Sequence, residues 1–140
     1  MKHGVIDASV VVQLFFEEQH SEAAERCLKR VGDLLAPDLV WVEVANVIWK
    51  RQRRGDISQE DSLGIAGQVL SLPLRTYSSS DLMADALELA IRFDRSVYDS
   101  LYLALAIRSK SCMVTADKRL ANALADTPVA KYVLWIGDLR

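Results

Sequence analysis

The sequence predicts a three-layer α/β fold in which helices cover both faces of a central parallel sheet of about five strands. Two features of the chain support this expectation. Short apolar runs alternate with longer segments whose apolar residues have helical spacing, and almost no tight-turn signals of the hairpin type join the short runs. Because consecutive parallel strands need a crossover connection, usually a helix, this alternation indicates right-handed βαβ units.

Five apolar segments are expected to form the strands, at residues 5–6, 34–36, 73–77, 112–114 and 132–136. Seven segments have helical periodicity, at residues 10–18, 21–31, 39–54, 58–70, 81–93, 97–109 and 117–125. Ser9, Ser58 and Ser96 are suitable N-cap residues for three of these helices, and Gly55 is the usual kind of residue to end the longest one. No linker, repeat or low-complexity segment interrupts the pattern, so residues 1–140 are expected to form a single domain.

Composition and charge limit the classes of function. The chain has 140 residues, enough for one sizeable core but not for two, and its net charge is −2. A nucleic-acid partner must therefore be attracted by a local basic patch or by a bound cation rather than by the field of the whole molecule. No apolar run approaches the roughly 20 residues that span a bilayer. Asp7 also interrupts the first segment before the apolar core of a signal peptide could form. We expect a cytoplasmic protein with no membrane partner.

Four acidic residues are expected to meet at one edge of the sheet. Ligands of parallel α/β folds bind at the carboxyl ends of the strands, where the following helices begin. Asp7 ends the first expected strand, and Asp117 lies just beyond the fourth. Glu43 lies in the early turns of the helix after the second strand, and Asp99 lies in the first turn of the helix that begins after Ser96. All four therefore belong to the same edge, although they are far apart in the sequence.

Each of these acids also has a structural interpretation. Asp7 and Asp117 could each cap a helix, and Asp99 fits the capping-box position relative to the residue three before it. Glu43 is harder to explain in this way, because residues 40–49 are apolar nearly all round and predict a buried helix, where an unpaired carboxylate is costly. Asn46, one turn further on, is a candidate hydrogen-bond partner, and a structural ion pair is the alternative.

Clustered carboxylates predict a cation. They raise each other's pKa unless a cation holds them together in the ionised form. No His or Cys ligand accompanies them, so the ion expected is one that prefers oxygen, Mg²⁺, with Mn²⁺ able to substitute. Such an ion activates a water and neutralises the charge that develops on a phosphate. The four acids therefore predict phosphodiester chemistry.

Four short stretches match one known family in order and spacing. They are V-I-D-A-S-V at residues 5–10, E-V-A-N-V-I at 43–48, Y-D-S-L-Y-L-A-L-A at 98–106 and T-A-D-K-R-L at 115–120. Together they extend over essentially the whole chain. On these residues the sequence resembles the PIN-domain family, and most closely the small VapC-type toxins of toxin–antitoxin systems.

The resemblance implies a PIN-like fold with strands ordered 3-2-1-4-5 and a Mg²⁺-dependent endoribonuclease that hydrolyses RNA with metal-activated water. The family's catalytic and metal-binding acids correspond to Asp7, Glu43, Asp99 and Asp117. Thr115 corresponds to a hydroxyl that supports the site, and Ser9 and Asn46 are further candidates for supporting roles. Proteins similar to this one form homodimers and are silenced by a cognate antitoxin, which covers or enters the acidic groove.

Two groups of basic residues are candidates to bind RNA phosphates, since such contacts position a nucleic acid without reading its bases. They are Lys50, Arg51, Arg53 and Arg54 at the end of the long helix, and Lys118 and Arg119 directly after Asp117. The alternative for the first group is a solvated helix end that the helix dipole favours. Trp41 and Trp49 could stack on bases, although core or interface positions are the more usual place for such residues.

Other functions remain open at this point. A Mg²⁺-binding receiver domain also gathers acids at strand ends, but no lysine directly follows the fourth strand. A PIN fold kept only for binding, or a PIN nuclease that processes RNA without being a toxin, would carry the same motifs. The apolar residues of segment 10–16 and of the helix containing Trp41 exceed what one core obviously needs. We therefore expect these two segments to provide a dimer or antitoxin surface.

Overall fold

A computed structural model describes residues 1–139 and contains one five-stranded sheet in which every pair of neighbours is parallel. The strands are β1 (His3–Ile6), β2 (Asp33–Pro37), β3 (Leu74–Tyr77), β4 (Met113–Thr115) and β5 (Val133–Trp135). Their order in the sheet is β3-β2-β1-β4-β5. Both the three-layer fold class and the strand order implied by the family resemblance are therefore confirmed.

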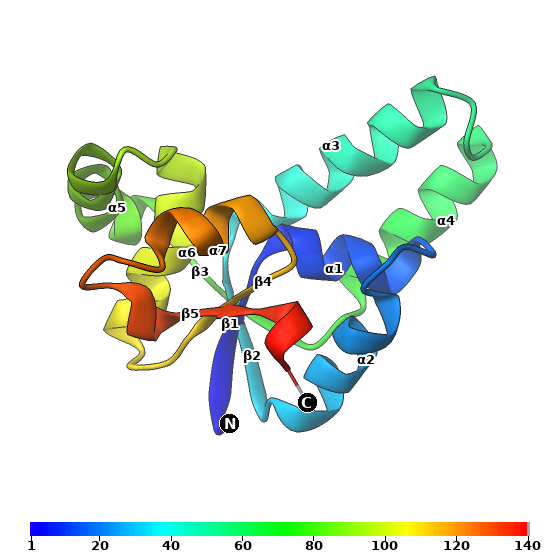
Figure 1. The fold of residues 1–140 in the computed structure, drawn as a ribbon. Coiled ribbons are helices and arrows are strands. Elements are labelled where there is room, and N and C mark those ends of the chain that lie inside the picture. Colours follow the sequence, from blue (N-terminus) through cyan, green and yellow to red (C-terminus); the bar gives the residue numbers. More distant parts are fainter. Residues whose placement is uncertain (140) are drawn as a thin grey trace.

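Seven α-helices connect the strands (Figure 1). They are α1 (Ala8–Phe15), α2 (Ser21–Arg30), α3 (Leu39–Arg53), α4 (Gln59–Leu70), α5 (Ser79–Phe93), α6 (Val97–Arg108) and α7 (Lys118–Leu124). Two short 3₁₀ turns, η1 (Ala130–Tyr132) and η2 (Ile136–Asp138), flank β5. The first helix begins two residues earlier than expected, because the chain turns into it directly after Asp7. None of the helices described in residues 1–139 is long and apolar enough to cross a membrane.

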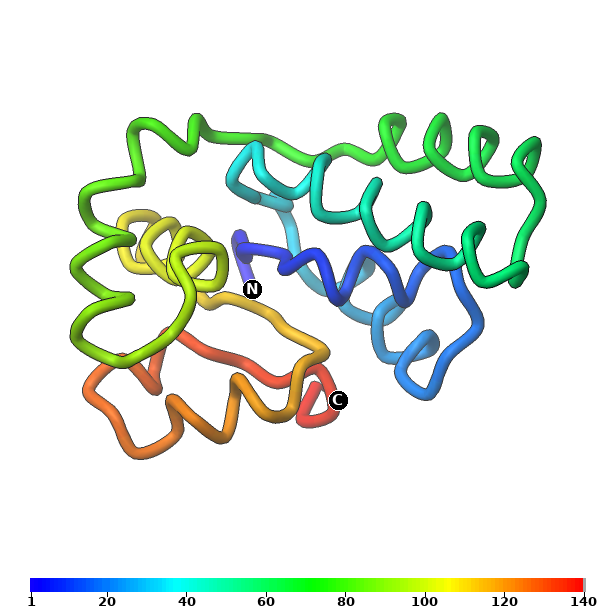
Figure 2. Tube along the Cα trace, turned by 90° about the horizontal axis from the view of Figure 1, so that it is seen from above, coloured from blue at the N-terminus to red at the C-terminus, as the bar shows by residue number. Residues whose placement is uncertain are grey.

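Right-handed crossovers place the helices on two sides of the sheet. The chain moves outward in one direction from β1 to β3 and returns to the other side of β1 for β4 and β5. As a result α1 to α4 lie on one face and α5 to α7 on the other, which Figure 2 shows from above. Because every strand is parallel, all the carboxyl ends meet at a single edge between these two groups of helices.

The core lies on both faces of the central strands. Val5 and Ile6 of β1 are fully buried, as expected for a parallel strand covered on both sides. Residues 100–106 of α6 are also buried without interruption, because this helix lies between the sheet and α5. On the opposite face the apolar residues at 10–12 pack into the same core. The surface expected at residues 10–16 is therefore wrong for these positions, since the fold itself covers them.

The long helix α3 is not buried all round, which corrects a second expectation. It buries only one stripe, formed by Val40, Val44 and Ile48. Val42 is 66% exposed and Trp49 is 51% exposed. The reason is visible in Figure 1, where α3 and α4 pack against each other and extend away from the sheet. Only the start of α3, which carries Glu43, remains close to the edge where the strands end.

Candidate active site

All four acids lie at the carboxyl edge of the sheet. Asp7 directly follows β1, and Asp117 lies two residues beyond β4. Glu43 is the fifth residue of α3, and Asp99 is the third residue of α6. These two helices come from opposite faces of the sheet, so the acids approach the end of the central strand from both sides.

Asp7 is the most deeply buried of the four and is held by two hydroxyl groups. Its side chain is 6% exposed. Ser9 Oγ donates a hydrogen bond to Asp7 Oδ2 at 2.9 Å, and Thr115 Oγ1 donates to the same oxygen at 2.8 Å. Although Asp7 occupies the N-cap position of α1, its side chain makes no capping hydrogen bond. The capping interpretation of this acid therefore does not apply.

The two hydroxyls that hold Asp7 also join β1 to β4. The backbone N–H of Ala116 donates to Ser9 Oγ at 3.0 Å, and the backbone N–H of Asp117 donates to Thr115 Oγ1 at 3.0 Å. The structure thus brings two of the predicted supporting residues, Ser9 and Thr115, onto the central acid. Asn46 is exposed and makes no side-chain hydrogen bond among the described residues, so it has no observed contact with this group.

Burial raises the pKa of Asp7 from its ordinary value of 3.8 to about 6. The hydrogen bonds from Thr115 and Ser9 act in the opposite direction, because they favour the ionised form, and the negative charge of Asp99 raises the pKa further. Ionising the Asp7 carboxylate therefore costs free energy in the folded protein. A bound cation would offset that cost, because a nearby positive charge favours the ionised form.

Glu43 presents an oxygen that has no partner. Its Oε1 atom is buried and accepts no hydrogen bond. The hydroxyl of Tyr102 is also buried and has no hydrogen-bond partner among the described residues. Burial raises the pKa of Glu43, the nearby Tyr102 hydroxyl lowers it, and the charges of Asp7 and Asp99 raise it again. A buried polar atom without a partner costs free energy. A cation at this edge would remove that cost, so Glu43 fits a metal ligand.

Asp99 and Asp117 combine capping with proximity to the other acids. The backbone N–H of Asp99 donates to Ser96 Oγ at 3.1 Å, as in a capping box. Asp117 Oδ1 accepts from the backbone N–H groups of Arg119 and Leu120 and so caps α7. Burial raises the pKa of Asp99, and the charge of Asp117 raises it further. Capping therefore fixes the Asp117 carboxylate itself, whereas for Asp99 it fixes only the backbone and leaves the carboxylate without a capping hydrogen bond among the described residues.

The four carboxylates lie near one another, but they do not surround a single position. The negative charge of Asp99 raises the pKa of Asp7, and the charge of Asp117 raises the pKa of Asp99. The charges of Asp7 and Asp99 both raise the pKa of Glu43. Even so, no three His, Cys, Asp or Glu side chains within residues 1–139 stand ready as ligands of one ion. Mutual repulsion is the physical reason for such spacing when four like charges share an edge. The donor set consists of oxygen alone, which suits Mg²⁺ or Mn²⁺.

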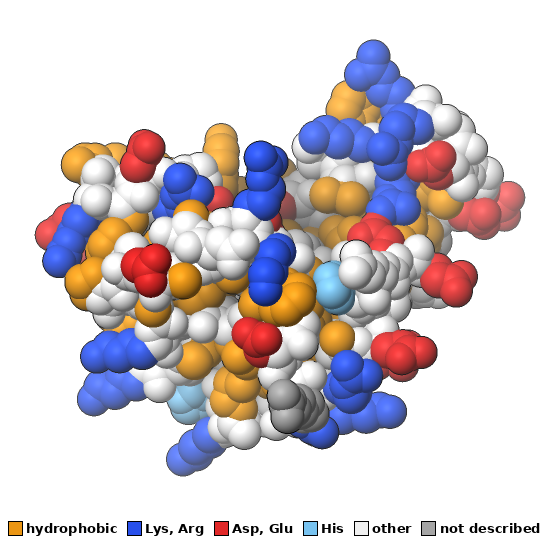
Figure 3. Space-filling view, in the orientation of Figure 1, with side chains coloured by type: hydrophobic (Ala, Val, Ile, Leu, Met, Phe, Trp, Pro, Cys, Tyr) orange, Lys and Arg blue, Asp and Glu red, His pale blue; other side chains and the backbone are white. Residues whose placement is uncertain are grey.

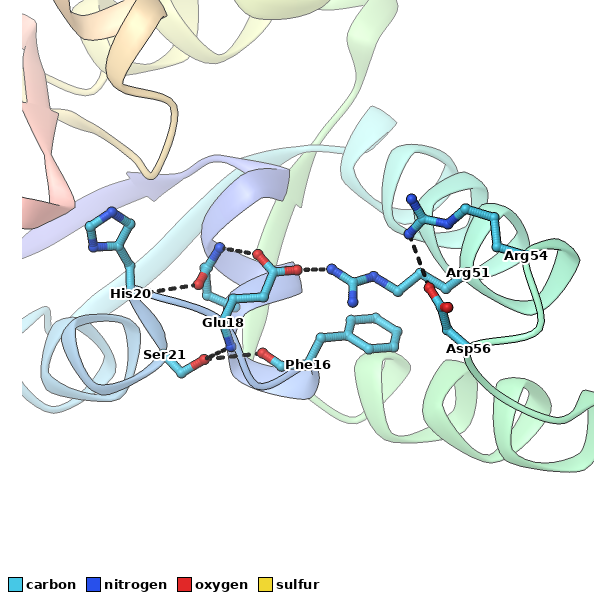
Figure 4. A network of polar contacts seen from close by, with 8 residues as sticks. Phe16, Glu18, His20, Ser21, Arg51, Arg54 and Asp56 are labelled. Atoms are coloured by element: carbon cyan, nitrogen blue, oxygen red, sulfur yellow. Dashed lines mark hydrogen bonds and ion pairs between the residues drawn. The ribbon is translucent and has the colours of Figure 1, made fainter.

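Within the predicted basic rim at the end of α3, Arg51 contacts other residues of the chain. Its guanidinium forms an ion pair with Glu18 and lies 4.4 Å from the centre of the Phe16 ring. Figure 4 shows how this pair joins the loop after α1 to α3, with the amide of Gln13 donating to the same carboxylate. The sequence could not show this contact, because its two partners are far apart along the chain.

The other basic residues of this group make separate local contacts. Arg54 pairs with Asp56 at 3.1 Å, and Arg53 lies over the Trp49 ring at 5.4 Å. Lys50 is exposed. These residues belong to the outer end of α3, which Figure 3 shows as a group of Lys and Arg side chains separate from those over α7. They do not border the acids.

Lys118 and Arg119 lie at the start of α7, directly beside Asp117. Lys118 Nζ is 3.5 Å from the centre of the Trp135 ring, a cation–π contact. That ring packs so closely on Gly137 that a Cβ atom there would lie 2.1 Å from it. Arg119 is exposed. Sequence reasoning missed Trp135, although its strand ends at the same edge in register with Thr115.

Two further residues at this edge were not predicted. Tyr102 lies one turn after Asp99 on α6, a spacing that could have indicated it, but the apolar helix around it pointed only to core packing. Arg95 precedes the cap of α6, and its positive charge lowers the pKa of Asp99. No motif identified it, because its position depends on the turn between α5 and α6.

The raised pKa of Asp7 predicts how stability depends on pH. The folded protein keeps a proton on Asp7 that the unfolded chain loses, so stability decreases as the pH rises from about 4 to about 6. Asp7→Asn removes this effect. We expect the variant to gain stability over the natural protein with rising pH, by up to about 3 kcal/mol, in urea unfolding experiments. The exposed Asp61→Asn variant is the control, and a gain for Asp7→Asn that does not vary with pH would contradict the account.

Two relatives named as ribonucleases are similar to this chain over most of its length. Ribonuclease VapC3 of Pyrobaculum aerophilum is 34% identical over 120 residues, which cover 84% of this chain and 92% of the relative. Ribonuclease VapC12 of Mycobacterium tuberculosis is 32% identical over 120 residues, covering 85% of this chain and 90% of the relative.

Solved structures show the same fold at lower identity. A crystal structure of a Pyrobaculum aerophilum protein has a TM-score of 0.72 and 22% identity, covering 99% of this chain and 86% of that one. The VapC20 toxin of Mycobacterium tuberculosis, described as cleaving the sarcin-ricin loop, has a TM-score of 0.67 and 19% identity, covering 86% of this chain and 94% of its own. A Klebsiella pneumoniae toxin–antitoxin complex has a TM-score of 0.62 and 16% identity, with coverages of 94% and 95%.

The PIN domain family itself matches residues 4–124, a range that contains all four acids. With this match and two relatives above 30% identity over most of their length, the chain belongs to the PIN-domain family and, within it, to the VapC proteins.

Proposed function

We propose that this protein is a divalent-cation-dependent endoribonuclease that hydrolyses RNA phosphodiester bonds and acts as the toxin of a toxin–antitoxin system. The observation that supports it most is the buried, unpartnered Glu43 Oε1 beside the costly carboxylate of Asp7. The names of the relatives, which are ribonucleases, support the same activity. Family membership removes the receiver-domain alternative.

The acids would hold the cation between the two layers of helices. Asp7 supplies the fixed point, because Ser9 and Thr115 hold one of its oxygens and leave the other for an ion. Glu43 and Asp99 approach from α3 and α6, and Asp117 lies at the exposed side. A divalent ion bound there supplies the positive charge that activates a water and offsets the charge of the phosphate.

RNA must approach an edge that is acidic, so nearby cations have to hold its backbone. Lys118 and Arg119 are the predicted residues that meet this need, because both lie at the start of α7 beside Asp117. The contact with Trp135 limits the motion of Lys118, so its charge stays close to the site. In this proposal the basic residues at the outer end of α3 do not contact the scissile phosphate.

The toxin role and the antitoxin partner rest on the relatives. Structural neighbours include a VapC20 toxin and a toxin–antitoxin complex. On this chain a mostly apolar groove between α3 and α4 is lined in part by the exposed side chains of Trp49 and Leu63. We propose this groove as the surface for an antitoxin segment, in place of the segment at 10–16, whose residues 10–12 are buried in the core.

Cleavage of RNA tests the proposed activity. Asp7→Asn and Asp99→Asn each remove one negative charge while keeping the shape of the side chain. We expect each variant to lose at least about a hundredfold in cleavage rate in the presence of Mg²⁺, because both the position and the charge of the cation depend on these groups. The measurement is cleavage of total RNA, with sequencing of the cut ends to locate the target.

Asp61→Asn is the matched control, because this acid is exposed in the first turn of α4 and makes no ion pair among residues 1–139. It should cleave as the natural protein does. Full activity of either site variant, or full activity in EDTA, would refute the mechanism. Mn²⁺ binding without any cleavage would favour a PIN fold kept for binding, and cleavage that an antitoxin does not silence would favour RNA processing.

A homodimer is also proposed, and α5 offers the surface for it. Met83, Leu87 and Ile91 are 60%, 49% and 76% exposed and recur every fourth residue, so they form one apolar stripe. A stripe of this kind is self-complementary in a two-fold dimer. Leu87→Lys should convert the protein to a monomer in light scattering, whereas Leu63→Lys on α4 should leave it dimeric. The opposite pattern would place the dimer contact on the α3–α4 pair.

A further inference from the structure

One arginine close to the acids differs from the other arginines of residues 1–139, because one of its side-chain nitrogens is buried without a hydrogen-bond partner. Arg51, Arg54, Arg75 and Arg108 each pair with an Asp or a Glu. Arg95 forms no ion pair and no side-chain hydrogen bond with any residue of the described chain, and its Nε atom is enclosed without a partner. A guanidinium without partners has N–H groups that donate no hydrogen bond within the chain. Leaving such donors unsatisfied costs free energy unless a ligand accepts their hydrogen bonds.

The backbone fixes where Arg95 lies. Asp94 ends α5 in the left-handed conformation, with φ of 53°, and Ser96 begins α6 as its N-cap. Arg95 is therefore the single residue between two helix caps, and its own N–H donates to Ala90 O at 3.3 Å. The packing of α5 on α6 holds this turn. The side chain consequently starts from a rigid position, four residues before Asp99.

The charge of Arg95 acts on the same edge as the acids. It is close enough to Asp99 to favour the ionised carboxylate, yet no ion pair joins the two within 4.0 Å. Arg95 thus lies on the α6 side of the acids, whereas Lys118 and Arg119 lie on the α7 side. Cations on both sides of the acids would neutralise successive phosphates of a nucleic-acid strand that crosses them.

We propose that Arg95 binds a backbone phosphate of the RNA beside Asp99, so that the strand is held on both sides of the acids. This inference rests on the proposed ribonuclease function and names a residue that positions its substrate. The planar fork of the guanidinium matches two phosphate oxygens. Its two terminal nitrogens are neither enclosed nor hydrogen-bonded within the described chain, so they are the donors for this bidentate contact. Any base can follow that phosphate, because the contact reads only the backbone.

The test measures RNA binding without cleavage. Asp7→Asn is the parent, and a short fluorescein-labelled single-stranded oligoribonucleotide of mixed sequence is titrated over a range of salt concentrations in fluorescence anisotropy. Adding Arg95→Ala should weaken binding about tenfold and lower the slope of log affinity against log salt by about 0.7, the share of one phosphate contact. Arg95→Lys should keep the slope, because it keeps the charge, and lose part of the affinity.

Arg92→Ala is the matched control, because Arg92 is an exposed residue of the last turn of α5 that stacks on Phe93. It removes the same charge one turn away and should change neither the affinity nor the slope. If Arg95→Ala leaves both unchanged, Arg95 only offsets the charge of Asp99 and the inference is wrong. If the Asp7→Asn parent itself binds no RNA, the proposed function is wrong together with the inference. Circular dichroism of the Asp7→Asn parent and of its Arg95→Ala derivative separates either result from a loss of folding.

Discussion

A carboxylate buried at the end of the central strand is the constraint on which the rest of this site depends. Asp7 follows β1 directly and is almost removed from solvent, so its ionised form is costly. Two hydroxyls offset part of this cost, and both come from chain segments beside the strand ends. The same contacts connect β1 to β4, so the fold and the site share their central hydrogen bonds.

The parallel sheet explains why other acids gather around Asp7. With β1 in the centre and all strands pointing one way, the starts of α3, α6 and α7 reach the same edge from both faces (Figures 1 and 2). Asp99 and Asp117 are placed there partly by their own capping contacts. Capping and a role in the site are therefore compatible. The cap uses only the backbone N–H of Asp99 and only one carboxylate oxygen of Asp117, and both carboxylates remain at the edge of the sheet.

Much of this could be predicted from the sequence. The alternation of short apolar runs with helices predicted the sheet, and the residues that follow each strand predicted the acids. Glu43 lies at the predicted edge, but the expected all-round burial of its helix is wrong, since α3 is half-exposed. Glu43 Oε1 is nevertheless buried, close to the Tyr102 hydroxyl. Periodicity cannot reveal which side of an apolar helix a second helix will cover.

Long-range contacts account for what the sequence could not predict. The pairing of Arg51 with Glu18 removes a basic residue from the predicted rim. The turn between α5 and α6 brings Arg95 to the acids, and the end of β5 brings Trp135 under Lys118. None of these contacts follows from local spacing, because each depends on how two distant segments pack.

The central claim is that the four carboxylates act together as the site of one kind of ion. The most direct measurement is calorimetric titration with Mn²⁺ near neutral pH, comparing the natural protein with Asp99→Asn and Asp61→Asn. The account predicts that Asp99→Asn weakens binding at least about tenfold, because a ligand and its charge are lost, while Asp61→Asn binds as the natural protein does. Equal Mn²⁺ affinity in all three proteins would contradict it.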